Sequence, residues 1–137
     1  MLTFKYVRAS SIQEVLALLR HPDLTYFNGD FPDAEWIGEF FNDGGHVYGA
    51  FEDDLLVGVI IAEDIKAQGV LLWYIATKDK NQGIGTRLIK AFEAMLEADG
   101  YTWLFLNATT ASRGFYEKND YLGRKEPVFE YFKGLES

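Results

Sequence analysis

The stretch IATKDKNQGIGTRLIKAF, residues 75–92, carries the strongest signal in the sequence. An apolar run ends at Ala76 and an amphipathic pattern begins after Gly83, which predicts a strand that leads into a helix. The chain has a formal net charge of −8, yet four cations gather around this junction: Lys78, Lys80, Arg87 and Lys90. The stretch therefore suggests a turn that binds an anion.

The start of a helix is suited to such a ligand. Its first amides have no partner inside the helix, and the aligned peptide dipoles place partial positive charge there, so a phosphate is stabilised. Gly83 and Gly85 let the main chain approach a ligand closely, and Thr86 adds a hydroxyl. The Walker motif has lysine where Thr86 stands, and the dinucleotide fingerprint has a third glycine where Leu88 stands. Neither motif fits, and an ordinary turn with solvated lysines would account for the same residues.

Composition limits the classes of function. A chain of 137 residues with 48% hydrophobic and 25% charged residues is typical of one globular domain, spanning residues 1–137. With no cysteine, disulfides, thiolate zinc sites and a cysteine nucleophile are excluded. The negative charge disfavours nucleic acids and anionic membranes as partners. We find no signal peptide or membrane span, and expect a cytoplasmic protein.

Hydrophobic periodicity predicts a mixed α/β (α+β) fold with the order β-α-α-β-β-β-α-β-α-β-β. Ser10 or Ser11 is expected to cap the first helix, and the acidic turn at residues 52–54 to join a hairpin. The predicted strands cover residues 3–8, 46–52, 55–64, 70–76, 101–107 and two segments within 121–134; the predicted helices cover residues 10–20, 33–43, 83–99 and 111–119.

Two stretches resemble the GNAT N-acetyltransferase family. Residues 75–88 resemble its acyl-CoA-binding motif, V-x-P followed by [RQ]-x-x-G-x-[GA], with Ile75, Thr77, Lys80, Gly83 and Gly85 at the motif positions. The departures are threonine for proline and lysine for arginine or glutamine. Lysine keeps the positive charge of arginine but lacks its planar, forked guanidinium group.

The second stretch is TTASRGFYEKNDYLG, residues 109–123, which resembles N-x-x-A-x-x-[LF]-Y-E-K-x-G-[FY]. Phe115 and Tyr116 match the aromatic pair, whereas Thr109, Ser112 and Asp120 replace asparagine, alanine and glycine. The order of predicted elements also matches, so the resemblance covers nearly the whole chain.

The resemblance implies a mostly antiparallel sheet with a V-shaped splay between its fourth and fifth strands, where acetyl-CoA binds. The pantetheine arm would bond to the main chain of Ile75 and Thr77, and the pyrophosphate to the amides of residues 83–86. The cofactor-binding residues implied in this way are Ile75, Ala76, Thr77, Lys80, Gln82, Gly83, Ile84, Gly85, Thr86, Arg87, Leu88, Thr109 and Ser112.

The resemblance also implies direct acetyl transfer to a primary amine, with Tyr116 as general acid toward the departing thiolate; packing beside Phe115 is the alternative role. No general base is assigned. Some family members carry a glutamate at the positions of Gly69 and Leu104, and neither residue here accepts a proton. The remaining candidates, His46, Glu63 and Asp64, are each more typical of solvated strand-end residues. The spacing of His21 and His46 indicates no metal site.

The acceptor is unidentified and is either a small-molecule amine or a peptide amine. The net negative charge of the chain favours a cationic acceptor. In this family the loop between the first two helices commonly shapes the acceptor pocket, and the candidate walls, which core packing explains equally, are Phe27, Phe31, Trp36 and Tyr74. A second hypothesis is a GNAT-like module that binds acyl-CoA as a sensor without turnover, and a third is a domain with no CoA site. A homodimer through the apolar residues 128–132 is compatible with the sequence.

Overall fold

The computed structural model describes residues 1–19, 34–42, 45–65, 68–78, 83–107, 118, 122–123 and 130–135. Within these ranges a seven-stranded sheet has the order β1-β2-β3-β4-β5-β7-β6. Its strands are β1 (Leu2–Tyr6), β2 (His46–Glu52), β3 (Leu55–Ile65), β4 (Gly69–Thr77), β5 (Trp103–Asn107), β6 (Leu122–Gly123) and β7 (Glu130–Gly134). The helices are α1 (Ile12–Leu19), α2 (Ala34–Asn42) and α3 (Ile84–Ala98).

The predicted fold class is confirmed. Every pair of neighbouring strands is antiparallel except β4 and β5, which run parallel. A parallel pair needs a crossover connection, and α3 supplies it between β4 and β5. The short helix predicted at residues 111–119 lies outside the described residues except for Lys118.

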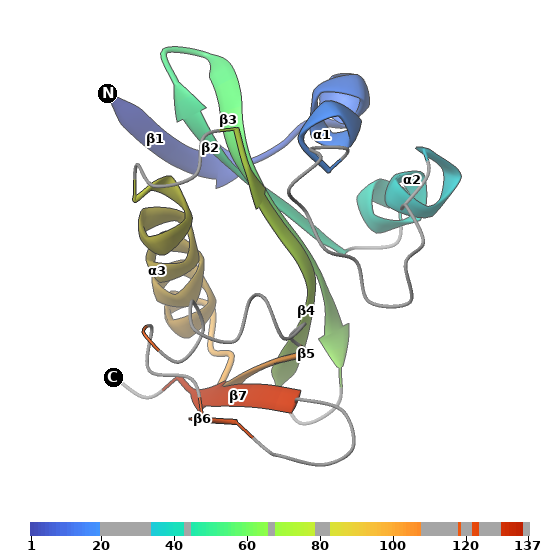
Figure 1. Cartoon of the computed structure of the whole chain (residues 1–137). Helices are drawn as coiled ribbons and strands as arrows, with labels where there is room; N and C mark the ends of the chain where they lie inside the picture. Colours follow the sequence, from blue (N-terminus) through green and yellow to red (C-terminus); the bar gives the residue numbers. More distant parts are fainter. Residues whose placement is uncertain are drawn as a thin grey trace.

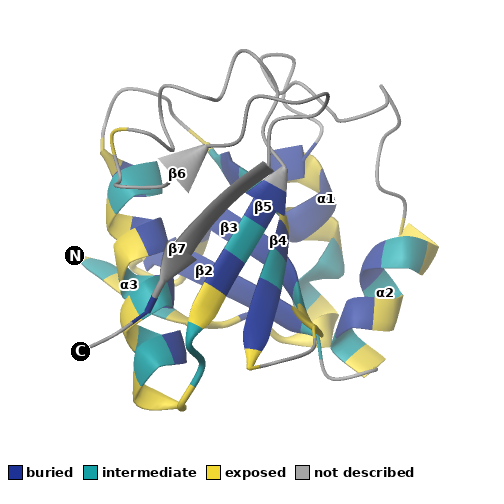
Figure 2. Cartoon of the chain, turned by 90° about the horizontal axis from the view of Figure 1, so that it is seen from below, coloured by how far each residue is buried: buried dark blue, intermediate teal, exposed yellow. Residues whose placement is uncertain are grey.

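The helices cover the two faces of a strongly twisted sheet (Figure 1). The helix α3 lies on one face, and α1 and α2 lie on the other. Buried residues concentrate on the strands between these two layers (Figure 2). There are two core clusters, one beneath α3 and one beneath α1 and α2. None of the described helices is long and apolar enough to cross a membrane.

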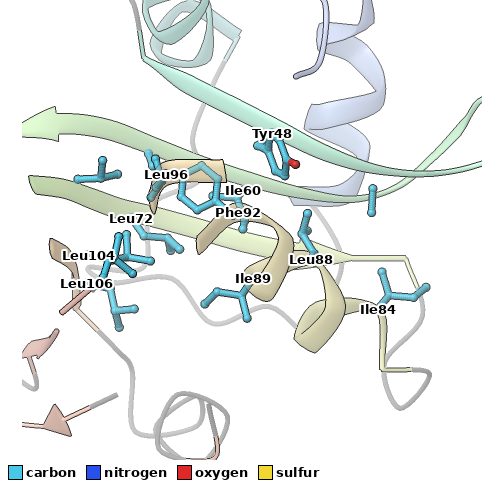
Figure 3. Packing of buried hydrophobic residues seen from close by; sticks show 14 of the residues in the cluster. Tyr48, Ile60, Leu72, Ile84, Leu88, Ile89, Phe92, Leu96, Leu104 and Leu106 are labelled. Atoms are coloured by element: carbon cyan, nitrogen blue, oxygen red, sulfur yellow. The ribbon is translucent and has the colours of Figure 1, made fainter. Parts of the chain in front are cut away.

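The helix α3 packs through residues spaced at three or four positions, as its sequence pattern predicts. Ile84, Leu88, Phe92 and Leu96 point from α3 toward the strands, where they meet Ile60 and the apolar residues of β4 and β5 (Figure 3). Phe92, Leu88 and Leu96 are completely buried. Burying each such side chain contributes about 1.5–3 kcal/mol.

Gly58 in β3 brings α3 close to the sheet. A Cβ at this position would lie 3.2 Å from Leu88 Cδ2 and 3.4 Å from Ile84 Cγ2. Such contacts are tighter than ordinary packing, so the missing side chain lets the first turns of α3 rest directly on β3. The start of α3 is thereby fixed beside the end of β4.

Two local predictions have different outcomes. The acidic turn forms the expected hairpin, and both Asp53 and Asp54 have positive φ, 50° and 80°, as a type I′ turn requires. Ser10 and Ser11 both lie inside a short 3-10 turn, η1 (Ala9–Ser11), which runs directly into α1 at Ile12. The N-cap of this turn is Arg8 and not a serine.

Candidate functional site

A bulge in β4 shapes the predicted acyl-CoA region. Tyr74 pairs with Ile61 of β3 and Leu72 pairs with Ala62, so Trp73 stands between two successive pairs as an extra residue. A bulge of this kind bends a strand and increases its twist. The strand therefore changes direction at Trp73.

The bulge also reverses which side chains face which layer. Leu72 and Ile75, three residues apart, both pack in the cluster beneath α3. Tyr74 and Ala76 pack in the other cluster, beneath α1 and α2. Because a regular strand alternates its side chains between faces, this switch requires the extra residue. The alternation of β4 before Trp73 thus does not continue after it.

The same bulge separates β4 from β5. These strands pair only between residues 69–72 and residues 103–106, although β4 continues to Thr77. From Trp73 onward, β4 follows β3 and has no described ladder to β5. This is the V-shaped splay expected between the fourth and fifth strands.

The main chain of β4 faces the splay at alternate residues. Lys78 N–H donates to the Val57 carbonyl at 2.8 Å, which makes this a hydrogen-bonded pair of the antiparallel ladder. Hydrogen-bonded and non-hydrogen-bonded pairs alternate, so Tyr74 and Ala76 also bond to β3. The main-chain groups of Ile75 and Thr77 consequently point away from β3, toward the splay. These are the two residues at which the family resemblance implies the pantetheine arm.

The first amides of α3 have no main-chain acceptor among the described residues. Gly83 is the N-cap in the left-handed conformation, with φ 72° and ψ 5°, and its carbonyl accepts a hydrogen bond from Arg87 N–H at 3.1 Å. The amides of Ile84, Gly85 and Thr86 precede that first bond and have no acceptor within the helix. No described atom lies within 4 Å of where a Cβ on Gly83 would stand. The geometry suits an anion.

The remaining predicted cofactor residues have different surroundings. Ile84 and Leu88 direct their side chains into the core, so Ile84 offers only its main chain to a ligand. The Arg87 guanidinium lies 5.8 Å from the centroid of the Phe4 ring, toward β1, and Lys78 is exposed. The predicted site residues that lie outside the described ranges are Lys80, Gln82, Thr109, Ser112 and Tyr116, together with the candidate acceptor-pocket walls Phe27 and Phe31.

Residues 12–133 match the family model described as an acetyltransferase (GNAT) domain. This chain belongs to the GNAT acetyltransferase family. No curated protein matches it at a significant level.

Solved structures share the fold of this GNAT domain at low sequence identity. The ribosomal-protein-S18-alanine N-acetyltransferase from Escherichia coli has a TM-score of 0.80 at 12% identity, covering 100% of this chain and 96% of that one. The PaiA N-acetyltransferase from Thermoplasma acidophilum, in complex with coenzyme A, has a TM-score of 0.75 at 17% identity over 98% and 99%. A GNAT-family acetyltransferase from Staphylococcus aureus Mu50 has a TM-score of 0.80 at 16% identity over 99% and 100%.

A cavity of about 250 Å³ lies on the α2 face of the GNAT sheet, beside the bulge. Its aromatic walls are Trp36 and Phe40 of α2 and Trp73 of β4, and its carboxylates include Glu39 and Glu63. The sequence indicated Trp36 as a wall but gave no signal for Trp73, which is 42% exposed. An exposed tryptophan in a run of buried strand residues becomes understandable once the bulge is known.

On the opposite face, a polar network crosses the first three strands. His46 is only 6% exposed, and its ring nitrogens bond to Tyr6 Oη at 2.7 Å and to Asp64 Oδ1 at 2.6 Å. The Tyr101 hydroxyl donates to both oxygens of Asp64, at 2.8 Å and 2.9 Å. The expectation that His46 is a solvated strand-end residue is wrong, because its ring packs against Phe92 of α3.

These contacts limit the choice of a general base. Phe92 lies eight residues after Ile84, or about 12 Å along the helix axis, so His46 lies far from the start of α3. Asp64 is engaged with His46 on the same face. Glu63 faces the other way, toward the cavity, and accepts a hydrogen bond from Trp73 Nε1 at 2.9 Å. No described group of three or more potential metal-ligating side chains is present.

The left-handed conformation of Gly83 predicts a measurable loss of stability. A methyl side chain at this position would be strained at φ 72°, so Gly83→Ala should lower the free energy of unfolding by about 1–2 kcal/mol. The matched control is Gly38→Ala in the interior of α2, where a Cβ also meets no described atom within 4 Å. That change should raise stability by about 0.5–1 kcal/mol. Urea unfolding measures both, and equal effects would contradict the assigned conformation.

The tyrosines of the polar network predict a loss of stability at high pH. Burial, then repulsion from Tyr101, Asp99 and Asp64, raises the pKa of Tyr6 from 10.0 to about 12. Burial, then the hydrogen bond to Asp64, raises the pKa of Tyr101 to about 12. The folded state keeps these protons where the unfolded state loses them, so the stabilisation is complete below pH 10.0 and is lost as pH rises through about 12.

Chemical denaturation across that pH interval tests this prediction. Tyr6→Phe and Tyr101→Phe should each flatten the alkaline fall in stability relative to the unmodified protein, because each removes one shifted phenol. If the free energy of unfolding falls equally steeply with pH in all three proteins, folding does not hold these hydroxyls in the neutral form.

Proposed function

We propose that this chain transfers an acetyl group from acetyl-CoA directly to a primary amine. The observation that carries the proposal is the junction of β4 and α3. There, the main chain of Ile75 faces the splay, and the first amides of α3, which have no acceptor within the helix, follow from Ile84 onward. Membership of the GNAT acetyltransferase family supports acetyl transfer, and the coenzyme A complex of the Thermoplasma acidophilum protein supports the choice of donor.

Each part of the donor has a counterpart in the chain. The amide groups of a pantetheine arm suit strand-like hydrogen bonds to the main chain of Ile75. The main chain of Thr77, two residues later, points in the same direction. A diphosphate suits the amides of residues 83–86, where hydrogen bonding and the helix dipole act together. Both contacts use the main chain. The replacement of motif side chains at Thr77 and Lys80 therefore leaves this binding mode intact.

The reaction requires a neutral amine. Its nitrogen lone pair attacks the thioester carbonyl carbon, a C–N bond forms, and the C–S bond breaks. The nitrogen loses one proton to solvent, and the thiolate takes one from Tyr116, which solvent then reprotonates. The products are the amide and free coenzyme A. A positioned acid of this kind typically contributes 10²–10⁴-fold to the rate.

Turnover and affinity together test the proposal. Free thiol should appear when acetyl-CoA is mixed with the protein and an amine from a panel of monoamines, diamines and amino acids. Tyr116→Phe should lower kcat by about 10²-fold or more because the thiolate loses its acid. Calorimetry should show the same affinity for coenzyme A, because the phenol is not part of the main-chain binding surface.

Two results would contradict the assignment. Full turnover in Tyr116→Phe would remove this tyrosine from catalysis while leaving the transferase intact. Binding of coenzyme A without thiol release for any amine would instead favour a module that binds acyl-CoA without transferring it.

A further inference from the structure

We propose that the cavity beside the bulge binds an organic ammonium group, so that the acceptor is a cationic amine carrying a second positive charge. This inference rests on the proposed function, whose site it extends. The cavity is lined by Trp36, Phe40 and Trp73, together with the carboxylates of Glu39 and Glu63. Its volume, about 250 Å³, suits a small organic group.

The aromatic walls gather three rings beside the carboxylates. The rings of Trp36 and Trp73 are in edge-to-face contact, at 85° to each other with their centroids 5.8 Å apart. Phe40 lies against Trp36, with centroids 4.4 Å apart. A cation near aromatic faces is attracted by their quadrupoles, and tryptophan is the strongest partner.

The Trp73 ring is held in position by a charged group. Its indole N–H donates to Glu63 Oε1 at 2.9 Å, while the side chain remains 42% exposed. The hydrogen bond uses the edge of the ring and does not use its face. Glu63 therefore fixes the ring and also supplies negative charge to the cavity.

The charge around the cavity selects the sign of the ligand. Glu39 and Glu63 line it, and of the described lining residues none is basic. An anion would be repelled, and a neutral aromatic ligand would gain nothing from the two carboxylates. The third acidic lining residue, Asp64, has its carboxylate bonded to His46 on the other face of the sheet.

The position of the cavity links it to the transfer site. Trp73 is the bulged residue at which β4 leaves β5, and Ile75 follows two residues later, about 7 Å along the strand. An amine that reacts in the splay must be neutral, so a charge held beside Trp73 belongs to a second group of the same molecule. A short diamine has such a pair of groups.

The experiment compares cadaverine with pentylamine, which share a five-carbon chain and a primary amine and differ in the second ammonium group. The unmodified protein should acetylate cadaverine with a kcat/KM at least about tenfold higher, a preference that corresponds to about 1.4 kcal/mol. Glu63→Gln removes one negative charge from the cavity but keeps a side-chain oxygen that can accept the hydrogen bond of the Trp73 indole. Glu39→Gln removes the second negative charge. Each should reduce several-fold the ratio of kcat/KM for cadaverine to kcat/KM for pentylamine, both measured in the same variant.

The matched control is Glu35→Gln, an exposed residue of the same helix that does not line the cavity. It changes the net charge of the protein equally and should leave the preference unchanged. Equal kcat/KM for the two amines in the unmodified protein would overturn the proposed subsite while the transferase function stands. If the preference for cadaverine fell equally in the Glu35→Gln control, the subsite would also be overturned, because the net charge of the protein would then explain the preference.

A binding measurement separates this proposal from turnover. Tetramethylammonium cannot be acetylated, and we expect it to shift the indole N–H resonances of Trp36 and Trp73 in the absence of acetyl-CoA, with Trp103 unaffected. Shifts at these two indoles without turnover of any amine would support the cation site and contradict the transferase. No shift at either indole, or equal shifts at all three tryptophans, would overturn the cation site.

Discussion

The extra residue in β4 is the constraint on which the rest of the site depends. Because Trp73 has no partner of its own in the ladder with β3, β4 bends and abandons β5 after four residue pairs. The main chain of Ile75 then points away from β3, and no described strand pairs with it on that side. The same residue carries an indole into the cavity beside α2. One local irregularity thus positions both a main-chain binding edge and an aromatic wall.

The electrostatics of the site are local. The chain carries a net charge of −8, so its overall field repels a diphosphate. Main-chain amides at the start of α3 counter this field only at short range, where dipole and hydrogen bonds act together. The close packing at Gly58 holds that helix start in place. A net negative charge is therefore compatible with the proposed phosphate site at one helix end.

Much of the fold was predictable because periodicity records local structure. The spacing of Ile84, Leu88 and Phe92 predicted α3, and the glycine turn predicted where it begins. The bulge was not predictable: residues 70–76 form a continuous apolar run in which no alternation reveals the extra position. The environment of His46 was also hidden, because its partners come from strands that only the folded register brings together. The second motif, with Tyr116, remains a prediction from sequence.

We propose that the amides at the start of α3 bind the diphosphate of coenzyme A. Amide resonances of residues 83–86 followed during titration with coenzyme A, and in parallel with pantetheine, test this claim most directly, because pantetheine has the arm and lacks the phosphates. We expect the amide resonances of Ile84, Gly85 and Thr86 to shift with coenzyme A and not with pantetheine, whereas that of Ile75 should shift with both ligands. Unchanged resonances at residues 83–86 on saturation with coenzyme A would contradict it.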